Sequence, residues 1–85
     1  RFLKAVQNMG ATYLALGDYD AAIDSLERAE RYAPRSASVQ YDLGRAYAGA
    51  FEIEKAMLAF KKAVALAPDS ALAKQAQARI QQLAQ

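Results

Sequence analysis

Apolar residues recur every three or four positions along most of the chain, which is the spacing of one face of an α-helix. Residues 3–16 carry such a stripe at Val6, Met9, Gly10, Tyr13 and Leu14. Gly17 and Asp18 then supply a helix stop and a helix cap, so we expect a second helix over residues 19–32. The buried stripe of that helix is expected to be Ala22, Ile23, Leu26, Ala29 and Ala33.

Pro34 ends this second helix, because proline lacks an N–H and restricts the residue before it. Ser36 is expected to cap a third helix over residues 37–50. The apolar pattern continues at Tyr41, Leu43, Gly44 and Tyr47, and then at Ala56, Met57, Phe60, Ala63 and Val64. Between these two stripes the turn is less clear, and we expect Gly49 to help break the helix there.

The pattern restarts at a fixed distance, since Pro34 and Pro68 are 34 residues apart. The same shift superposes Gly10 on Gly44, Tyr13 on Tyr47, Ala22 on Ala56, Ala29 on Ala63, and Ser36-Ala37 on Ser70-Ala71. A chance alignment would not match glycines, tyrosines and prolines together, so the sequence contains an internal repeat.

The spaced residues Gly10, Tyr13, Gly17, Tyr19, Ala22, Leu26, Ala29 and Pro34 resemble the tetratricopeptide repeat, a 34-residue unit of two antiparallel helices. The second unit departs from the family at Phe51 and Ile53, and neither unit has the family's tryptophan. The resemblance implies an all-α fold, a right-handed superhelical stack of five helices. Residues 1–34 and 35–68 would each form one helical hairpin, and residues 69–85 would form a C-terminal capping helix.

The last segment has the polarity of a terminal helix. Lys74, Gln77 and Gln81 are polar where a continuing repeat would need large buried residues. The apolar residues Leu72, Ala73, Ala76, Ile80 and Leu83 form the opposite stripe, which we expect to face the preceding unit.

The start of the chain gives two further expectations. It lacks an initiator methionine, so we expect it to be a segment of a longer protein. Phe2, Leu3 and Ala5 could pack against a further repeat or against another copy of the chain, and self-association would use the end that carries Phe2, Leu3 and Val6.

In the family, the first helix of each unit lines a concave groove that holds a peptide. Carried over position by position, the resemblance implies that the groove is lined from the first unit by Lys4, Gln7, Asn8, Ala11 and Leu14. The second unit would add Ser38, Tyr41, Asp42, Arg45 and Ala48, and the last helix Leu72, Gln75, Arg79 and Gln82. Tyr41 with Arg45 and Arg79 would anchor a partner, because aromatic and guanidinium groups dominate binding hot spots. The alternatives are inter-helix packing for Tyr41 and solvated charge for the arginines.

One subclass of the family clamps the C-terminal carboxylate of a chaperone tail with lysine, arginine and asparagine side chains. The matching positions here are Gln7, Ala11, Asp42, Leu72 and Ala76, and none of them fits. Asp42 would also repel an acidic tail. We therefore expect no carboxylate clamp of this kind.

The amino-acid composition excludes several kinds of functional site. The 85 residues include no cysteine and no histidine, so a disulfide, a thiolate nucleophile and a typical zinc site are excluded. Asp18, Asp20 and Asp24 could form a cation site, but carboxylates also favour the positive end of a helix. We expect no catalytic residue, no metal and no cofactor.

Net charge and hydropathy bear on partners. The net charge of +2 comes from interleaved signs without a basic stripe, so we expect no nucleic-acid partner. No charge-free apolar run approaches the ~20 residues of a membrane span, so we expect no membrane insertion.

The function that these observations favour is non-catalytic protein–protein interaction, with the domain as an adaptor or scaffold that binds a protein or peptide in its groove. Two alternatives remain, a self-association segment and a substrate-recruiting domain of a larger enzyme. The sequence does not decide between a cytoplasmic and a periplasmic location.

Overall fold

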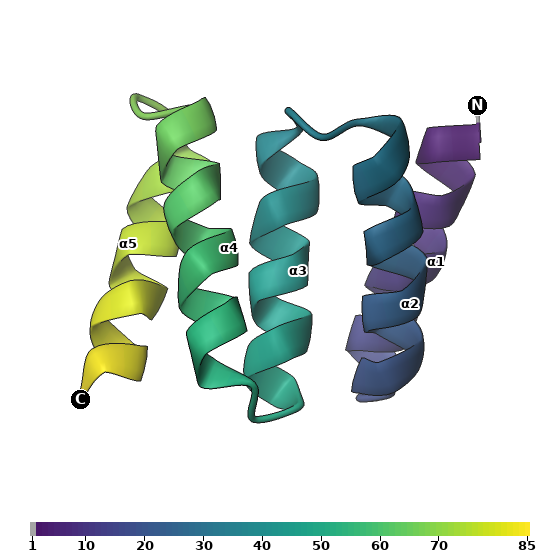
Figure 1. Ribbon diagram of the computed structural model, residues 1–85, viewed down its shortest axis with the longest axis horizontal. Coiled ribbons are helices and arrows are strands. Elements are labelled where there is room, and N and C mark those ends of the chain that lie inside the picture. The colour runs from purple at the N-terminus through teal and green to yellow at the C-terminus, as the bar shows by residue number, and fades with distance from the viewer. Residues whose placement is uncertain (1) are drawn as a thin grey trace.

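The computed structural model describes residues 2–85, and its regular secondary structure there consists of α-helices. They are α1 (Phe2–Leu16), α2 (Tyr19–Tyr32), α3 (Ala37–Gly49), α4 (Ile53–Leu66) and α5 (Ala71–Ala84). Short connections make each helix antiparallel to the next (Figure 1). The predicted all-α stack of five helices is confirmed, and both prolines lie in turns between helices.

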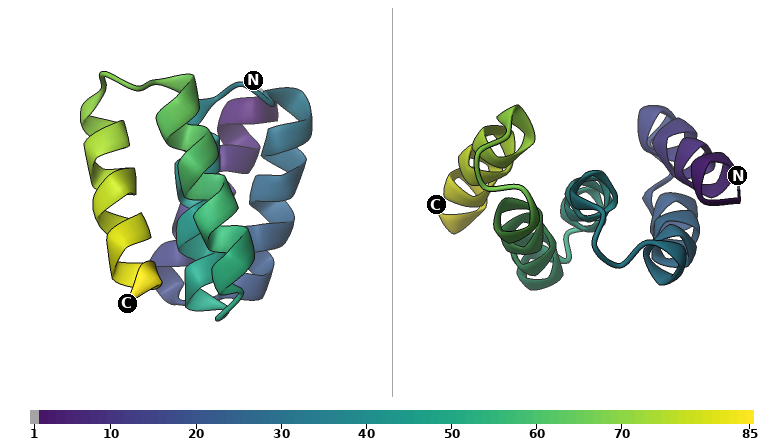
Figure 2. Two further views of the ribbon diagram at one scale, coloured as in Figure 1. Left: turned by 60° about the vertical axis from the view of Figure 1, so that its left-hand side comes forward. Right: turned by 90° about the horizontal axis from the view of Figure 1, so that it is seen from above.

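The helices lie in two rows. Seen from above, α2 and α4 form an outer row, and α1 and α5 lie on the other side with α3 set back between them (Figure 2). Within the described residues α3 contacts every other helix, whereas α2 does not contact α4 and α1 does not contact α5. This arrangement places α1, α3 and α5 on one side of the molecule, which we call the inner face (Figure 2).

Two apolar cores hold the rows together. The first contains Leu26 and joins α1, α2 and α3 with Ala59 of α4, and the second contains Phe60 and joins α3, α4 and α5. Leu26 and Phe60 occupy equivalent positions of the two units, and both side chains are fully buried. The predicted stripe is confirmed at Ala22, Leu26, Ala29, Ala56, Phe60 and Ala63, all of which are buried.

The first helix departs from its expected role in two ways. Met9, which belongs to the apolar pattern of this helix, is 43% exposed. Val6 is buried and Leu3 packs against the first core, so these two side chains leave little surface for pairing copies of the chain. Their side chains are already covered by the chain's own helices, while Phe2 remains exposed.

Each hairpin depends on a glycine that faces the large core residue of its second helix. A Cβ atom on Gly10 would lie 2.5 Å from Cγ of Leu26, and one on Gly44 would lie 2.6 Å from Cδ1 of Phe60. Because both large side chains are fully buried, neither can move aside at low cost. The missing Cβ atoms therefore allow the paired helices to approach closely.

The turns inside the two hairpins have the same geometry although their residues differ. Gly17 has φ of +76° and Phe51 has φ of +63°, both in the left-handed region. Asp18 N donates to Tyr13 O at 2.9 Å, and Glu52 N donates to Tyr47 O at 2.9 Å, the long hydrogen bond of a Schellman helix end. The unclear second turn is thus a copy of the first, with phenylalanine at the glycine position.

Gly49 lies where the sequence predicted a break in the helix, and α3 ends there. It is the last residue of the helix, and a Cβ atom there would overlap the ring of Tyr19 from the preceding hairpin. The glycine therefore makes room for packing between the two hairpins, and the helix ends through the left-handed residue Phe51.

Side-chain caps begin three of the helices. Asp18 accepts a hydrogen bond from Ala21 N, and Ser36 accepts one from Val39 N, so both predicted caps are confirmed. Ser70 caps α5 in the same way. The polar residues Lys74, Gln77 and Gln81 are exposed on α5, while Ala73 and Ala76 are buried, as the sequence predicted for this helix.

Gly44→Ala is expected to lower the free energy of unfolding by about 1–3 kcal/mol, because the added methyl group overpacks the Phe60 ring. Urea denaturation followed by circular dichroism measures this loss. The loss should shrink in a Phe60→Leu background, and an equal loss in both backgrounds would exclude the ring contact as its cause.

Phe51→Gly is expected to raise the free energy of unfolding by about 1 kcal/mol, because glycine adopts the left-handed conformation without steric strain. The ring is 86% exposed, so little buried surface is lost. Gly17→Ala should have the opposite effect of about the same size. A Phe51→Gly variant that is less stable than the parent would contradict the prediction that the left-handed conformation strains Phe51.

Candidate binding face

The sequence-predicted groove residues come from the three inner helices, α1, α3 and α5. Most of them are exposed, namely Lys4, Asn8, Ala11, Ser38, Arg45, Gln75, Arg79 and Gln82. Four are half-buried, namely Gln7, Asp42, Ala48 and Leu72. Tyr41 is only 8% exposed, and Leu14 is buried in the first core. The expectation that Leu14 lines the groove is therefore wrong, and a ligand could reach little of the Tyr41 ring.

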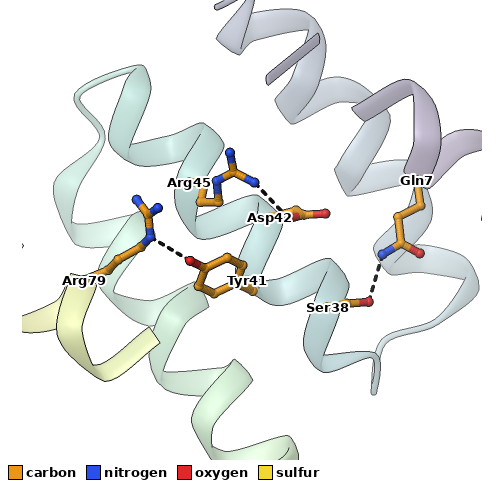
Figure 3. Close-up of polar contacts among 6 residues, drawn as sticks. All are labelled: Gln7, Ser38, Tyr41, Asp42, Arg45 and Arg79. Carbon is orange, nitrogen blue, oxygen red and sulfur yellow. Dashed lines mark hydrogen bonds and ion pairs between the residues drawn. The ribbon is translucent and has the colours of Figure 1, made fainter. Parts of the chain in front are cut away.

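Two hydrogen bonds join the inner helices directly (Figure 3). Gln7 Nε2 on α1 donates to Ser38 Oγ on α3 at 2.8 Å. Arg79 Nε on α5 donates to Tyr41 Oη on α3 at 2.8 Å. These bonds span residues far apart in the sequence, so they tie the two hairpins and the last helix into one face.

Tyr41 packs as part of the second core. Its ring meets the Phe60 ring edge-on, with centroids 5.5 Å apart and an interplanar angle of 61°. The Arg79 guanidinium lies 5.6 Å from the Tyr41 ring centroid, a distance at which a cation and an aromatic face attract. The sequence left two roles open for Tyr41, a partner anchor and inter-helix packing, and these contacts favour packing. They also give Tyr41 a second role, which is to orient Arg79.

Asp42 and Arg45 form a loose ion pair on the inner side of α3. Arg45 Nη1 lies 3.7 Å from Asp42 Oδ1, too far for a hydrogen bond, and the side chains are 41% and 18% exposed. Burial raises the pKa of the Asp42 carboxyl, and the charge of Arg45 opposes that shift. At this separation the pair contributes little to stability, so both groups remain able to form ion pairs with a ligand.

Comparison with known families identifies the repeat. The family model of the tetratricopeptide repeat matches residues 8–71, from within α1 to the first residue of α5. The chain belongs to the tetratricopeptide repeat family. None of the curated proteins compared with the chain matches it significantly. Repeats of this family generally mediate protein–protein interaction and are typically non-catalytic.

The acidic side chains and the helix lengths of this tetratricopeptide repeat domain bear on metal binding and membrane insertion. Within residues 2–85, no cluster of three or more acidic, cysteine or histidine side chains is arranged to hold a metal ion. Asp18, from the acidic group noted in the sequence, caps α2. None of the helices described combines the length and the apolar character that a membrane span requires.

Sequence reasoning missed the polar contacts between α2 and α3. Gln40 Nε2 donates to Glu30 Oε2 at 2.7 Å, and Tyr47 Oη donates to Glu27 Oε2 at 2.6 Å. Burial and the bond to Glu27 both raise the pKa of the Tyr47 hydroxyl. The available signal was Gln40 itself, a polar residue at the position where this family often has a buried tryptophan.

Asp42→Asn is expected to change how stability depends on pH. Because the folded-state pKa of Asp42 is raised, its stabilising contribution is full below the unfolded-state pKa, about 3.9. That contribution is lost as pH rises through the higher folded-state pKa. The variant should therefore gain stability relative to the parent on going from acid to neutral pH.

Melting temperatures of the parent and Asp42→Asn, measured from about pH 3.5 to pH 7, would show this difference. Asp69→Asn is a matched control, because that carboxylate is exposed in the turn between α4 and α5. Parallel pH profiles for the parent and Asp42→Asn would contradict the prediction.

Proposed function

We propose that the inner face formed by α1, α3 and α5 binds an extended or helical segment of a protein partner, and that the domain acts as a non-catalytic adaptor or scaffold. In this proposal residues 1–34 and 35–68 are the two repeats that build the face. Residues 69–85 form the capping helix at the end of the stack. In this proposal they supply a third set of side chains to the face.

The observation that carries the proposal is the gathering of charged and amide side chains from all three inner helices on one side. Lys4 on α1, Arg45 on α3 and Arg79 on α5 are exposed, and the Asp42 carboxylate lies 3.7 Å from Arg45. The guanidinium groups of Arg45 and Arg79 project in the same direction from α3 and α5 (Figure 3). Guanidinium groups recognise carboxylates through paired hydrogen bonds, so an acidic side chain of the partner is the group that fits best.

The contacts of Arg79 support a recognition role. Its Nε atom is already bonded to the buried Tyr41 hydroxyl, and its planar group lies against the Tyr41 ring. A side chain that is held before the ligand arrives loses less conformational entropy on binding. Arg79 is thus preorganised, whereas Arg45 has only the loose contact with Asp42.

Asp42 argues for an internal segment of the partner rather than its C-terminus. The carboxylate lies on α3, the middle one of the three inner helices, 3.7 Å from Nη1 of Arg45. A terminal carboxylate placed there would meet a like charge, which opposes binding. We therefore propose a segment that pairs a basic group with Asp42 and an acidic group with Arg45 or Arg79.

Arg45→Glu is expected to weaken binding of such a segment at least about tenfold, equivalent to about 1.4 kcal/mol. A displayed peptide library selected on the immobilised chain would provide ligands, and fluorescence anisotropy would measure their affinities. Circular dichroism should show unchanged helical content, because Arg45 is exposed.

Arg28→Glu is the matched control, since Arg28 is exposed on α2, in the outer row. The same peptides should bind this variant as they bind the parent. Equal affinity for the Arg45→Glu variant, or equal losses in both variants, would count against the inner face as the binding site.

A further inference from the structure

The outer row of helices carries a groove between α2 and α4. In the part of the chain that the structure describes, both helices contact α3 but not each other, so α3 forms the floor between them (Figure 2). Two hollows of about 530 Å³ and about 220 Å³ lie along this groove and share three lining residues. We define the outer groove by Glu30 on α2, by Lys55, Leu58 and Lys62 on α4, and by Gln40 and Tyr47 on α3.

The outer groove does not lie at an end of the stack. Its walls are the second helices of the two repeats, and its floor is the first helix of the second repeat, so the chain itself forms every side of it. A further repeat would add its helices at the ends of the two rows, whereas this groove lies between two neighbours within one row.

The α2 wall presents two carboxylates that α3 holds in place. Tyr47 Oη donates to Glu27 Oε2 at 2.6 Å. Gln40 Nε2 donates to Glu30 Oε2 at 2.7 Å. Among residues 2–85, neither carboxylate forms an ion pair with a lysine or an arginine. Both are therefore preorganised to accept a hydrogen bond from a cation that the described chain does not supply.

The α4 wall carries the opposite charge. Lys55 Nζ lies 3.3 Å from Glu52 Oε1 and 5.8 Å from the centroid of the Tyr47 ring, so its charge is partly compensated. Lys62 is exposed and pairs with no carboxylate in the described part of the chain. An occupant of the outer groove therefore meets carboxylates on one side and an uncompensated ammonium group on the other.

The α4 wall is also apolar between its charges. Ala65 and Leu66 follow Leu58 by seven and eight positions, which places all three on one side of the helix. Leu58 is 60% exposed and Leu66 is 38% exposed. A shift of 34 residues carries Leu58 to Asp24 of α2, which is exposed in the same row, so the packing of the repeat does not require leucine here.

We propose that the outer groove binds an amphipathic helix of a protein partner, with one flank basic and the other acidic. The apolar stripe of that helix lies against Leu58 and Leu66. Its basic flank meets the carboxylates of Glu27 and Glu30, and its acidic flank meets Lys62. Complementary charges of this kind favour one class of partner and disfavour helices whose flanks carry a single sign.

The form of the groove favours a helix over an extended segment. The α4 wall from Lys55 to Leu66 rises by about 16 Å, or about three helical turns. An extended segment needs partners for its backbone N–H and C=O groups, and residues 2–85 form no strand that could supply them. A helix bonds its own backbone and needs from the groove only contacts for its side chains.

This inference does not rest on the function proposed for the inner face. Arg45 and Arg79 belong to α3 and α5 on the inner face, whereas α2 and α4 form the walls of the outer groove. The two surfaces can therefore fail separately, and the variants below distinguish them.

Two synthetic peptides of about four helical turns test the outer groove. Both carry leucine at i, i+4, i+7 and i+11, with the same numbers of lysine and glutamate. In the sorted peptide each flank of the leucine stripe has one sign of charge, and in the mixed peptide both signs alternate on each flank. Fluorescence anisotropy should give a dissociation constant of the order of 100 µM for the sorted peptide, and at least about fivefold weaker binding of the mixed one. No binding of the sorted peptide, or equal binding of both, would overturn the proposal.

Leu58→Asp should weaken binding of the sorted peptide at least about tenfold. The first repeat has aspartate at the equivalent position, so circular dichroism should show unchanged helical content. Glu30→Gln retains an acceptor for Gln40 and removes the charge, so the sorted peptide should bind this variant more nearly as the mixed one does. Leu16→Asp, at an exposed apolar position on α1, is the control and should leave binding unchanged. Unchanged binding to Leu58→Asp, or an equal loss in Leu16→Asp, would overturn the proposal.

Two other results would assign a different arrangement. If Arg45→Glu abolished binding of the sorted peptide and Leu58→Asp did not, the peptide would lie on the inner face, which would support the function proposed above and overturn the outer groove. Sedimentation equilibrium of the chain alone should give 9.2 kDa from about 1 µM to about 1 mM. A rise toward twice that mass that Leu58→Asp abolishes would make a second copy the occupant and overturn the proposal.

Discussion

The close approach of a glycine to one large buried side chain determines the geometry of each hairpin. Gly10 faces Leu26 and Gly44 faces Phe60, and in each case the space of a Cβ atom is already filled. Because this contact recurs after 34 residues, both hairpins have the same spacing between helices. The positions of α1 and α3 on one face, and hence the face itself, follow from that spacing.

The repeat made most of the fold predictable, since prolines, caps and small residues act through local chemistry. Asp18 and Ser36 cap helices wherever their backbone geometry occurs, and proline stops a helix in any context. The turn at Phe51 could not be predicted from local chemistry, because phenylalanine does not indicate a positive φ. There the hydrogen bond from Glu52 to Tyr47 and the position of α4 impose a conformation that the side chain disfavours.

The sequence predicted which helices carry the candidate residues, but not how exposed each residue is. Position-by-position comparison put Arg45 and Arg79 on the inner helices, where the structure has them. Periodicity alone could not show that α5 covers Tyr41, or that the outward side of α1 leaves Met9 open. Whether a residue is buried depends on which neighbouring helix is present, and a stripe on a single helix contains no such information.

The central position of α3 has a consequence for cooperativity. Within the described residues it is the one helix in contact with all the others, so each apolar core includes part of it. Loss of α1 or α5 leaves one core intact, whereas disorder in α3 removes both at once. A molecule that occupies the inner side of α3 would therefore couple the two halves of the domain, and its binding energy would raise the resistance of the whole chain to local opening.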